Sequence, residues 1–329
     1  MSSTLEHRVV ALGGTRVGAG PAVVVAGRIS LRARPVVSGG PAPSLQEAVA
    51  AARWRGERQG DQWGERPGSR GGEAPPGREA RAPLVEPADA GDLPAIAERA
   101  DGVVVGASWT RDIPLVRGAA ALGMPVVVER RPSASLEEWL ALADYCALEG
   151  SGEVILCEGG RLDLGLLRAA REASGRPVLA DVTGAPGLSA AAVAAGADGL
   201  VLGGLPAAPD PSAPGVVDAE ELRAAREAVT LVGALLRPEA PATLPECREA
   251  IDRVDAALAT LLERRAALAG VVQTLKPVGG FAGRDPERER SLVARMARRA
   301  PGLGEERLAA VMNAVIEAGL HLAEERRRP

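Results

Sequence analysis

Short runs of β-branched and other apolar residues alternate with helical patterns over roughly the first 230 residues. Gly, Pro or charged residues bound each run, which is typical of strands that are buried on both faces of a parallel sheet. Seven such strands are clear in the sequence. They cover residues 21–27, 82–86, 102–107, 125–130, 152–158, 176–182 and 198–204.

Helical patterns occupy the intervals between these strands. A regular alternation of strand and helix implies right-handed βαβ units and a parallel sheet. With a weaker eighth strand candidate at residues 53–58, the pattern predicts a (β/α)8 TIM-type barrel of class α/β, preceded by a small hairpin at residues 7–19. The helical patterns cover residues 44–53, 91–99, 112–122, 135–148, 163–173, 188–196 and 218–229.

Two segments do not fit a packed barrel. Residues 56–82 consist largely of Gly, Pro, Arg and Glu, so we interpret them as a low-complexity insertion. A Pro-rich stretch follows the last barrel helix and indicates a linker at residues 237–243. A chain of 329 residues is long enough for two domains, which we place at residues 1–236 and 244–329.

The second domain begins with a long amphipathic helix that carries positive charges on its apolar stripe. Arg265 belongs to this stripe at heptad spacing, together with Ile251, Leu258 and Val272. We therefore expect Arg265 on the buried face of an all-α bundle, where its guanidinium needs a carboxylate of the protein or an anionic ligand. Lys276 follows eleven residues later, close to three turns of helix, and projects on the same side.

A further arginine on this helix points away from that pair. Arg248 lies seventeen residues before Arg265, which places it about 100° away around the same helix. Arg248 can reach the same pocket only from a second copy of the helix. The sequence therefore predicts a homodimer in which two of these helices meet.

The pattern CREAIDRVDAALATLLERRAALAGVVQTLK, followed by a turn and GRDPERE, resembles the all-helical class of chorismate mutase. That class implies three helices per subunit and a dimer whose long first helices cross. By this resemblance, Arg248 is given to the partner's site, and Arg265 binds the substrate carboxylates within its own subunit. Lys276 matches the lysine at the ether oxygen of the substrate.

The GRDPERE string supplies the remaining site residues. The resemblance implies that Glu289 holds the substrate hydroxyl and that Arg288 supports the site, and it includes Asp285 in the same motif. Asp285 and Pro286 also fit the N-cap and first position of the next helix. Because the conversion of chorismate to prephenate is a unimolecular rearrangement, it requires positioning and charge stabilisation, and we expect no cofactor and no metal.

These charges also have ordinary structural interpretations. Arg265 could form an internal salt bridge with Asp255 or Glu289, and Lys276 could be a solvated helix end. Arg288 and Glu289 could lie on an exposed first turn without any function. The spacing alone leaves these alternatives open.

The third helical pattern, RLAAVMNAVIEAGLHLAEERRR, departs from the chorismate mutase pattern. At the positions of a serine and of a glutamine that bonds the ether oxygen, this chain has Gly319 and Ala323. A shift by one residue would bring in Glu324 as a substrate-binding group, which must be protonated to donate. Activity would then rise at acidic pH. Loss of such a donor can cost about 10²–10³ in rate.

The barrel region resembles the microbial class of DAHP synthase (3-deoxy-arabino-heptulosonate 7-phosphate synthase), which condenses phosphoenolpyruvate with erythrose 4-phosphate on a divalent metal. The strings GMPVVVERRPSASLEEWLALADYCALEGSGEVILCEGG and AAAVAAGADGLVLGG carry the resemblance. The metal-binding side chains of that class are missing, since a metal site needs donor groups that these residues do not have. The positions of its cysteine, histidine, glutamate and aspartate ligands align with Ile29, Gly184, Gly203 and Ser212.

The phosphate-binding groups of DAHP synthase also differ. Its lysine after the fifth strand is replaced by Glu129, and its Ala-Arg-Asn string becomes Ala-Ser-Trp at residues 107–109. Arg130 and Asp181 do match. We therefore expect the barrel to be non-catalytic.

The sequence thus predicts a chorismate mutase of aromatic amino-acid biosynthesis that carries a degenerate DAHP synthase-like barrel. One alternative is a non-catalytic regulatory subunit that senses chorismate or prephenate and pairs with a true DAHP synthase. The second is an intact bifunctional enzyme. The assembly could extend from a dimer to a tetramer.

The net charge, the aromatic content and the N-terminal sequence argue against a nucleic-acid-binding or membrane protein. A net charge of −4 and an aromatic content of 2% argue against binding of nucleic acid or an anionic membrane surface. The N-terminus lacks an apolar signal region, and no long apolar stretch occurs. We therefore expect a cytoplasmic protein without membrane contact.

Overall fold

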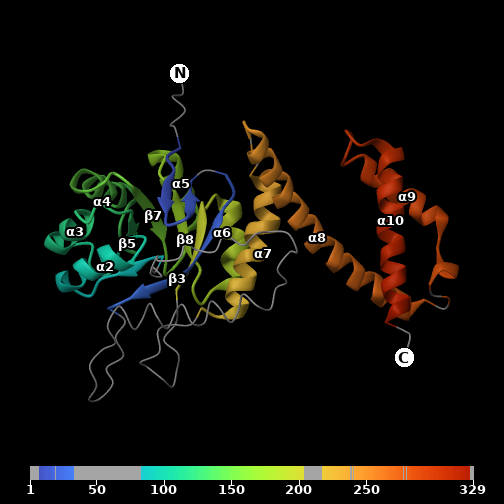
Figure 1. The fold of residues 1–329 in the computed structure, drawn as a ribbon, viewed down its shortest axis with the longest axis horizontal. Coiled ribbons are helices and arrows are strands. Elements are labelled where there is room, and N and C mark those ends of the chain that lie inside the picture. The colour runs from blue at the N-terminus through green and yellow to red at the C-terminus, as the bar shows by residue number, and fades with distance from the viewer. Residues whose placement is uncertain are drawn as a thin grey trace, which may run out of the picture. The chain divides into compact units, whose positions relative to one another are not determined.

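The computed structural model describes residues 7–18, 20–32, 83–203, 217–237, 239, 241–276, 278 and 280–326. The chain divides into two compact units, Met1–Ala240 and Pro241–Pro329 (Figure 1). None of the helices in the described ranges has the length and apolar character that a membrane-spanning segment requires.

Parallel strands of the first unit form a closed barrel, as the alternating pattern predicts. Its seven strands within the described residues follow each other in chain order around the sheet. The barrel closes because β3 pairs on one edge with β9 and on the other with β4, where Ile29 lies opposite Val85. The strands are β3 (Val23–Ser30), β4 (Val85–Glu86), β5 (Val103–Val105), β6 (Val126–Glu129), β7 (Val154–Glu158), β8 (Val178–Asp181) and β9 (Gly199–Gly203).

Several predicted features fall between β3 and β4. The helix predicted at residues 44–53, the eighth strand predicted at residues 53–58 and the insertion predicted at residues 56–82 all lie outside the described residues.

Helices follow the strands and cover the outside of the barrel (Figure 1). Side chains at their N-termini fix where they begin: Ser135 forms a capping box with Glu138, and Asp163 and Asp218 each accept two backbone N–H groups. The last barrel helix extends beyond the pattern at 218–229 and ends at Leu236, where the predicted linker begins. The helices are α2 (Leu93–Arg99), α3 (Ile113–Ala120), α4 (Leu136–Glu149), α5 (Leu164–Ser174), α6 (Ser189–Ala195) and α7 (Ala219–Leu236), with short 3-10 turns η1 (Ala90–Asp92) and η2 (Pro186–Leu188).

Alternate strand residues belong to two separate cores. In β6, Val126 and Val128 pack outward against the helices, whereas Val127 faces the barrel interior. The hairpin of β1 (Val10–Leu12) and β2 (Thr15–Val17) adds its buried apolar side chains to the interior core. Arg8 N donates to Gly175 O, just before β8, so the hairpin lies at the amino ends of the strands. Function in such a barrel is therefore sought at the carboxyl ends.

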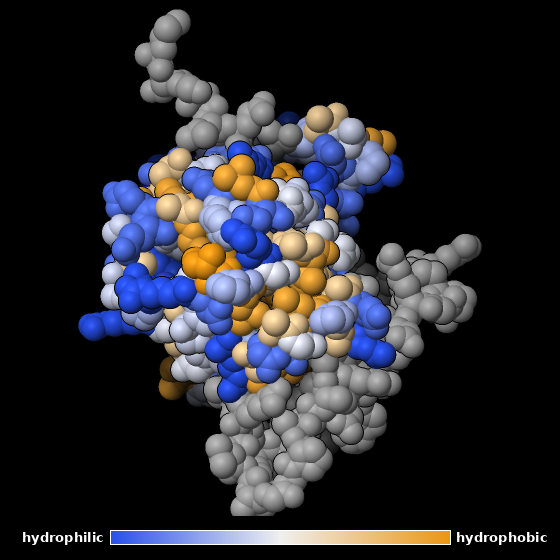
Figure 2. Space-filling view, turned by 90° about the vertical axis from the view of Figure 1, so that its left-hand side faces the viewer, coloured by the Kyte–Doolittle hydropathy of each residue, from blue (hydrophilic) through white to orange (hydrophobic). Residues whose placement is uncertain are grey.

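The outer surface of the first unit is mixed in character. The face turned to the viewer in Figure 2 carries hydrophilic side chains around a central group of apolar ones. Ile113 of α3 and Leu148 of α4 are among the exposed large apolar residues of this unit. Scattered exposed apolar residues are normal for a folded domain.

The second unit is a bundle of three helices, as predicted. Thr243 and Glu246 form a capping box at the start of α8 (Leu244–Leu275), and Asp285 caps α9 (Pro286–Ala297). A short 3-10 turn, η3 (Phe281–Gly283), lies in the connection between them. The last helix, α10 (Gly304–Glu325), packs against both α8 and α9.

The apolar stripe of α8 is largely exposed within a single chain. Ile251 and Leu258 are 58% and 51% exposed, and the buried residues of α8 are Ala257 and Gln273. Arg265, in the same stripe, is half-buried. The expectation of a buried stripe is therefore wrong for the N-terminal half of α8 in the isolated chain, because α9 and α10 do not cover it.

Candidate functional site

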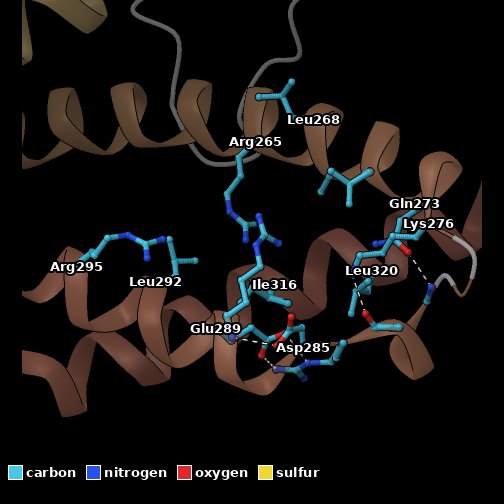
Figure 3. A pocket seen from close by; sticks show the side chains of 16 residues that line it. Arg265, Leu268, Gln273, Lys276, Asp285, Glu289, Leu292, Arg295, Ile316 and Leu320 are labelled. Atoms are coloured by element: carbon cyan, nitrogen blue, oxygen red, sulfur yellow. Dashed lines mark hydrogen bonds and ion pairs between the residues drawn. The ribbon is translucent and has the colours of Figure 1, made fainter.

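A cavity of about 310 Å³ lies between the helices of the second unit (Figure 3). We refer to it below as the interhelical cavity. Its walls combine apolar side chains from all three helices with charged groups from α8, α9 and the α8–α9 connection. The lining residues are Arg265, Leu268, Ala269, Val272, Gln273, Lys276, Gly280, Gly283, Arg284, Asp285, Arg288, Glu289, Leu292, Arg295, Ile316 and Leu320.

The charges of the interhelical cavity are unbalanced. Five cationic side chains line it against two carboxylates, which leaves a formal excess of three positive charges. Burial of cations without counterions is unfavourable, so such a wall favours an anionic ligand. The apolar residues of α8 and α10 give the same cavity a surface for a hydrocarbon ring.

Arg265 projects from α8 into the cavity (Figure 3). Its Nη1 donates to the carbonyl oxygen of Val315 on α10 at 3.2 Å. Within the described residues it makes no ion pair, and neither Asp255 nor Glu289 neutralises it. The internal salt bridge that the sequence left open is therefore absent from the described part of the chain, and the guanidinium is available to an anion.

Lys276 ends α8 and turns back toward the connection. Its Nζ donates to the carbonyl oxygen of Gly283 at 2.7 Å, and the side chain is half-buried. This contact contradicts the alternative of a freely solvated helix end. The ammonium group lies in the cavity wall. Arg265 and Lys276 are at opposite ends of the same face of α8.

Gln273 is a buried polar residue of the cavity wall that the sequence reasoning missed. Its Oε1 accepts from the backbone N–H of Gly280 at 2.7 Å, which fastens the connection to α8. The helical spacing contains a signal for it, because residue 273 lies eight positions after Arg265 and three before Lys276, on the same face.

The start of α9 carries the three predicted site residues of the GRDPERE string, which are Asp285, Arg288 and Glu289. Asp285 caps the helix by accepting from the backbone N–H of Arg288 at 3.0 Å, so its predicted capping role is confirmed. The guanidinium of Arg288 has no hydrogen bond or ion pair among the described residues. Glu289 is held by Arg284, another residue that the sequence reasoning did not identify.

Arg284 makes the densest set of polar contacts in the second unit. Its Nε and Nη2 donate to the two carboxylate oxygens of Glu289 at 3.1 and 2.7 Å. Its Nη1 and Nη2 also reach Glu317 at 3.3 Å and Asn313 at 2.7 Å on α10. The hydrogen bond with Glu289, followed by the effect of Glu317, raises the pKa of Arg284.

Two predicted site residues lie outside the interhelical cavity. Arg248 is exposed near the N-terminus of α8 and does not line the cavity of its own chain. Glu324 is not one of the lining residues, but its carboxylate lies beside Gly280, which is. A side chain at Gly319 would meet Arg265 and Ala269, and its absence leaves space beside the guanidinium.

A second group of charges lies at the carboxyl ends of the barrel strands, which we call the barrel mouth. Arg28 of β3 pairs there with Asp181 at 2.8 Å, with Glu86 at 3.1 Å and with Glu129. Its side chain is only 14% exposed. One guanidinium thus holds three carboxylates from three strands.

The pKa shifts in the barrel mouth follow from this arrangement. Burial disfavours the charged Arg28, but Glu129, Asp181 and Glu86 outweigh it and raise the pKa of the guanidinium. Burial raises the pKa of Glu129, although Arg28 and the N–H of Ala107 act in the opposite direction.

The other predicted barrel residues are also engaged internally. Arg130 forms a bidentate pair with the fully buried Glu158 at 2.5 and 2.6 Å. Trp109 is buried and donates through its indole N–H to Glu86 at 3.1 Å. These contacts leave no unpaired arginine among the barrel-mouth residues named here.

Three of the four expected metal positions in the barrel lie within the described residues and carry no donor side chain. Ile29 in β3, Gly203 at the end of β9 and Gly184 after β8 have no donor side chains, and Ser212 lies outside the described residues. No group of three or more His, Cys, Asp or Glu side chains in the described part of the chain is arranged to hold a metal ion. At the expected positions that the structure describes, no side chain can ligate the divalent metal of a DAHP synthase.

Family models match both regions of the chain. Residues 247–324 match chorismate mutase type II, and residues 84–202 match the DAHP synthetase I family. The chain therefore carries a DAHP synthase-type domain followed by a C-terminal chorismate mutase type II domain, as the two sequence patterns predict.

Known proteins resemble the barrel region. A phospho-2-dehydro-3-deoxyheptonate aldolase of Thermotoga maritima is 33% identical over 128 residues, and this match spans 34% of the chain and 38% of the relative. A truncated 3-deoxy-D-arabino-heptulosonate 7-phosphate synthase from Thermotoga maritima has a TM-score of 0.50 at 23% identity, over 70% of this chain and 94% of that one. A phospho-2-dehydro-3-deoxyheptonate aldolase (DAHP synthase) structure from the same organism has a TM-score of 0.51 at 24% identity. The match covers 70% of this chain and 74% of that one. These two likenesses concern the fold alone.

Proposed function

We propose that the helical unit converts chorismate to prephenate and that the barrel no longer condenses phosphorylated substrates. The observation that carries the first part is the half-buried Arg265, which faces an apolar cavity without a carboxylate partner among the described residues. The match of residues 247–324 to chorismate mutase type II supports the same reaction.

The interhelical cavity suits a small dicarboxylate. A volume of about 310 Å³ is at the lower end of the range for small-molecule sites. Arg265 and Arg288 offer planar guanidinium groups, which bind carboxylates in a bidentate manner. Val272, Ile316 and Leu320 form apolar walls that favour a compact conformer of the substrate.

The rearrangement requires stabilisation of negative charge on the ether oxygen as the bond breaks. Lys276 supplies a positive charge on a flexible side chain, and the carbonyl oxygen of Gly283 holds that charge at the cavity wall. Glu289 faces the same cavity and can accept a hydrogen bond from the substrate hydroxyl, because each carboxylate oxygen has more than one acceptor site. The site residues thus act through position and charge.

A second copy of the chain completes this proposal. Ile251, Val254, Leu258 and Leu261 are 58%, 55%, 51% and 49% exposed, and they recur at heptad spacing on α8. Such a stripe pairs favourably with the same stripe of another copy, which buries apolar area and brings Arg248 to the partner's cavity.

The barrel mouth supports the second part of the proposal. Arg28 and Arg130 in this mouth are each neutralised by buried carboxylates. The positive charges of these two arginines are therefore used by the protein's own acids and are not available to a phosphate. The positions expected to hold the metal lack donor atoms where the structure describes them.

The proposal is tested by prephenate formation with the full chain and with two matched variants. Arg265→Ala should lower kcat/KM by about 10²-fold or more, because an electrostatic contact of the transition state is lost. Arg264→Ala removes an exposed arginine one position away and should leave the rate unchanged. Equal rates for Arg265→Ala and Arg264→Ala would contradict the assignment of the site.

A regulatory role is the second candidate. Gly319 and Ala323 provide no donor from α10 to the ether oxygen, and the neutralised barrel mouth shows no unpaired cation among the residues named above. A sensor that pairs with a true DAHP synthase would bind chorismate or prephenate without turnover. If calorimetry shows that chorismate or prephenate binds and no product forms, the result would favour this role over catalysis.

A further inference from the structure

Arg284 connects three parts of the helical unit. It precedes the N-cap of α9, contacts Glu289 in the first turn of α9, and reaches Glu317 and Asn313 on α10. Asn313 in turn donates to Glu317 at 2.9 Å, which closes a ring of hydrogen bonds. The four side chains therefore constrain each other.

The Arg284–Glu289 pair is bidentate. Two N–H groups of one guanidinium meet the two oxygens of one carboxylate, which is the strongest arrangement of such a pair. The two side chains are 26% and 24% exposed, so the pair is screened less than a surface ion pair. Glu289 is thereby held in one orientation.

This orientation matters because Glu289 and Arg265 share the interhelical cavity (Figure 3). Arg288 lines the same cavity. Neither of these arginines has an acidic partner among the described residues. A carboxylate free to rotate would be attracted to them and would compete with an anionic substrate for the same guanidinium groups.

We propose that Arg284 is a positioning residue that binds Glu289 and Glu317 and so keeps Arg265 and Arg288 available to the substrate carboxylates. This inference rests on the proposed chorismate mutase function of the cavity. Arg284 itself acts through Glu289 and need not touch the substrate. The alternative is a purely structural bracket between α9 and α10.

A variant cycle on the full chain separates the two roles. Steady-state kinetics with chorismate and calorimetric titration with prephenate are compared for Arg284→Met, Glu289→Gln and the double variant. Competition predicts that Arg284→Met raises KM and the prephenate Kd about tenfold, the scale of one charged hydrogen bond, with a smaller change in kcat. The double variant should return to the values of Glu289→Gln alone, because the competing carboxylate has been removed.

Two further variants act as controls. Asn313→Ala removes one bond of the ring but leaves the Arg284–Glu289 pair, so KM should change little. Arg284→Lys keeps the charge but loses the bidentate fork, so KM should fall between the wild type and Arg284→Met. If Arg284→Met fails to fold, which a thermal melt reveals, Arg284→Lys and its double variant with Glu289→Gln carry the same comparison.

The outcomes are distinct. A wild-type chain that neither converts chorismate nor binds prephenate would overturn the proposed function and this inference with it. An active wild type whose KM is unchanged in Arg284→Met would overturn the inference alone. A double variant as impaired as Arg284→Met would show a structural bracket and would also overturn it.

Discussion

Arg265 and Arg28 are both partly buried arginines, but their surroundings are opposite. Arg265 has one backbone carbonyl as its hydrogen-bond partner and makes no ion pair among the described residues. Arg28 meets three carboxylates in the barrel mouth, and all four side chains are mostly buried. The first arrangement leaves positive charge for a ligand, whereas the second uses it to hold the protein's own acids together.

Removal of Arg28 should therefore destabilise the barrel. Arg28→Met leaves Glu86, Glu129 and Asp181 close together without a cation, and loss of one partner of a buried ion pair costs about 3–5 kcal/mol. All four tryptophans precede residue 140, so tryptophan fluorescence in a denaturant titration reports on the barrel. Arg111→Ala, an exposed arginine, is the matched control. A loss no larger than that of the control would contradict the role of Arg28.

The same variant should respond to pH. Burial already raises the pKa of Glu129 in the folded protein, and Arg28 opposes that rise, so Arg28→Met should raise this pKa further. A carboxyl whose pKa is higher in the folded state binds protons on folding, and its stability contribution falls as pH rises through the interval between the two pKa values. The difference in the free energy of unfolding between wild type and Arg28→Met should therefore become smaller as the pH is lowered from neutral. A difference that stays constant with pH would contradict this.

Some cavity residues follow from spacing and others do not. The helical period alone predicts that Arg265 and Lys276 share one face of α8, and both side chains lie in the cavity wall. Arg284 lies in a connection without periodicity. Its partners Asn313 and Glu317 are about thirty residues away in sequence, so only the packing of α10 brings them together.

At the level of elements, α8 is the least covered part of the helical unit. Its stripe repeats every seven residues, which is the pattern of helices that pair. The heptad pattern predicts an apolar face correctly, but it does not show which helix covers that face. In the single chain, the N-terminal half of the stripe is exposed, and it is the surface that the proposed dimer would bury.

Mixing of two inactive variants tests whether copies share a site. In a heterodimer of Arg248→Ala and Arg265→Ala, one site combines the intact Arg248 of one chain with the intact Arg265 of the other. Random assembly of a symmetric dimer should then restore about a quarter of the wild-type rate. Restoration is measured as prephenate formation after co-refolding or co-expression. A mixture of Arg264→Ala and Arg265→Ala is the reference, because every site in it retains Arg248. If the mixture of Arg248→Ala and Arg265→Ala recovers no rate, the shared site is contradicted.

The barrel elements are predicted well because their signals are local. Continuous apolar runs identify the strands of a parallel sheet, and acidic or serine caps mark the helix starts. The last barrel helix, α7, ends at Leu236, directly before the predicted linker at residues 237–243. The predicted strand at residues 53–58 lies outside the described residues, and the described sheet closes through β3 and β4.

On the scale of the whole molecule, fold and site chemistry are separable. The barrel core depends on alternating apolar residues that are independent of the residues at the mouth. A DAHP synthase-type fold therefore does not require that the residues at the mouth bind a metal or a phosphate. The charge pattern places the proposed activity in the helical unit.

A metal experiment tests this division. We expect Mn²⁺ and other divalent ions to leave the full chain without condensation of phosphoenolpyruvate and erythrose 4-phosphate, because Ile29, Gly184 and Gly203 cannot ligate a metal. Exhaustive chelation should leave prephenate formation unchanged. Phosphate release that depends on the metal would contradict a non-catalytic barrel.

The central claim is that the positively lined interhelical cavity turns chorismate over. The most direct measurement follows chorismate by NMR in the presence of a small amount of the full chain after chelation of metals. We predict many turnovers, with one prephenate formed for each chorismate consumed. Chorismate that binds the chain but remains unconverted would contradict the account.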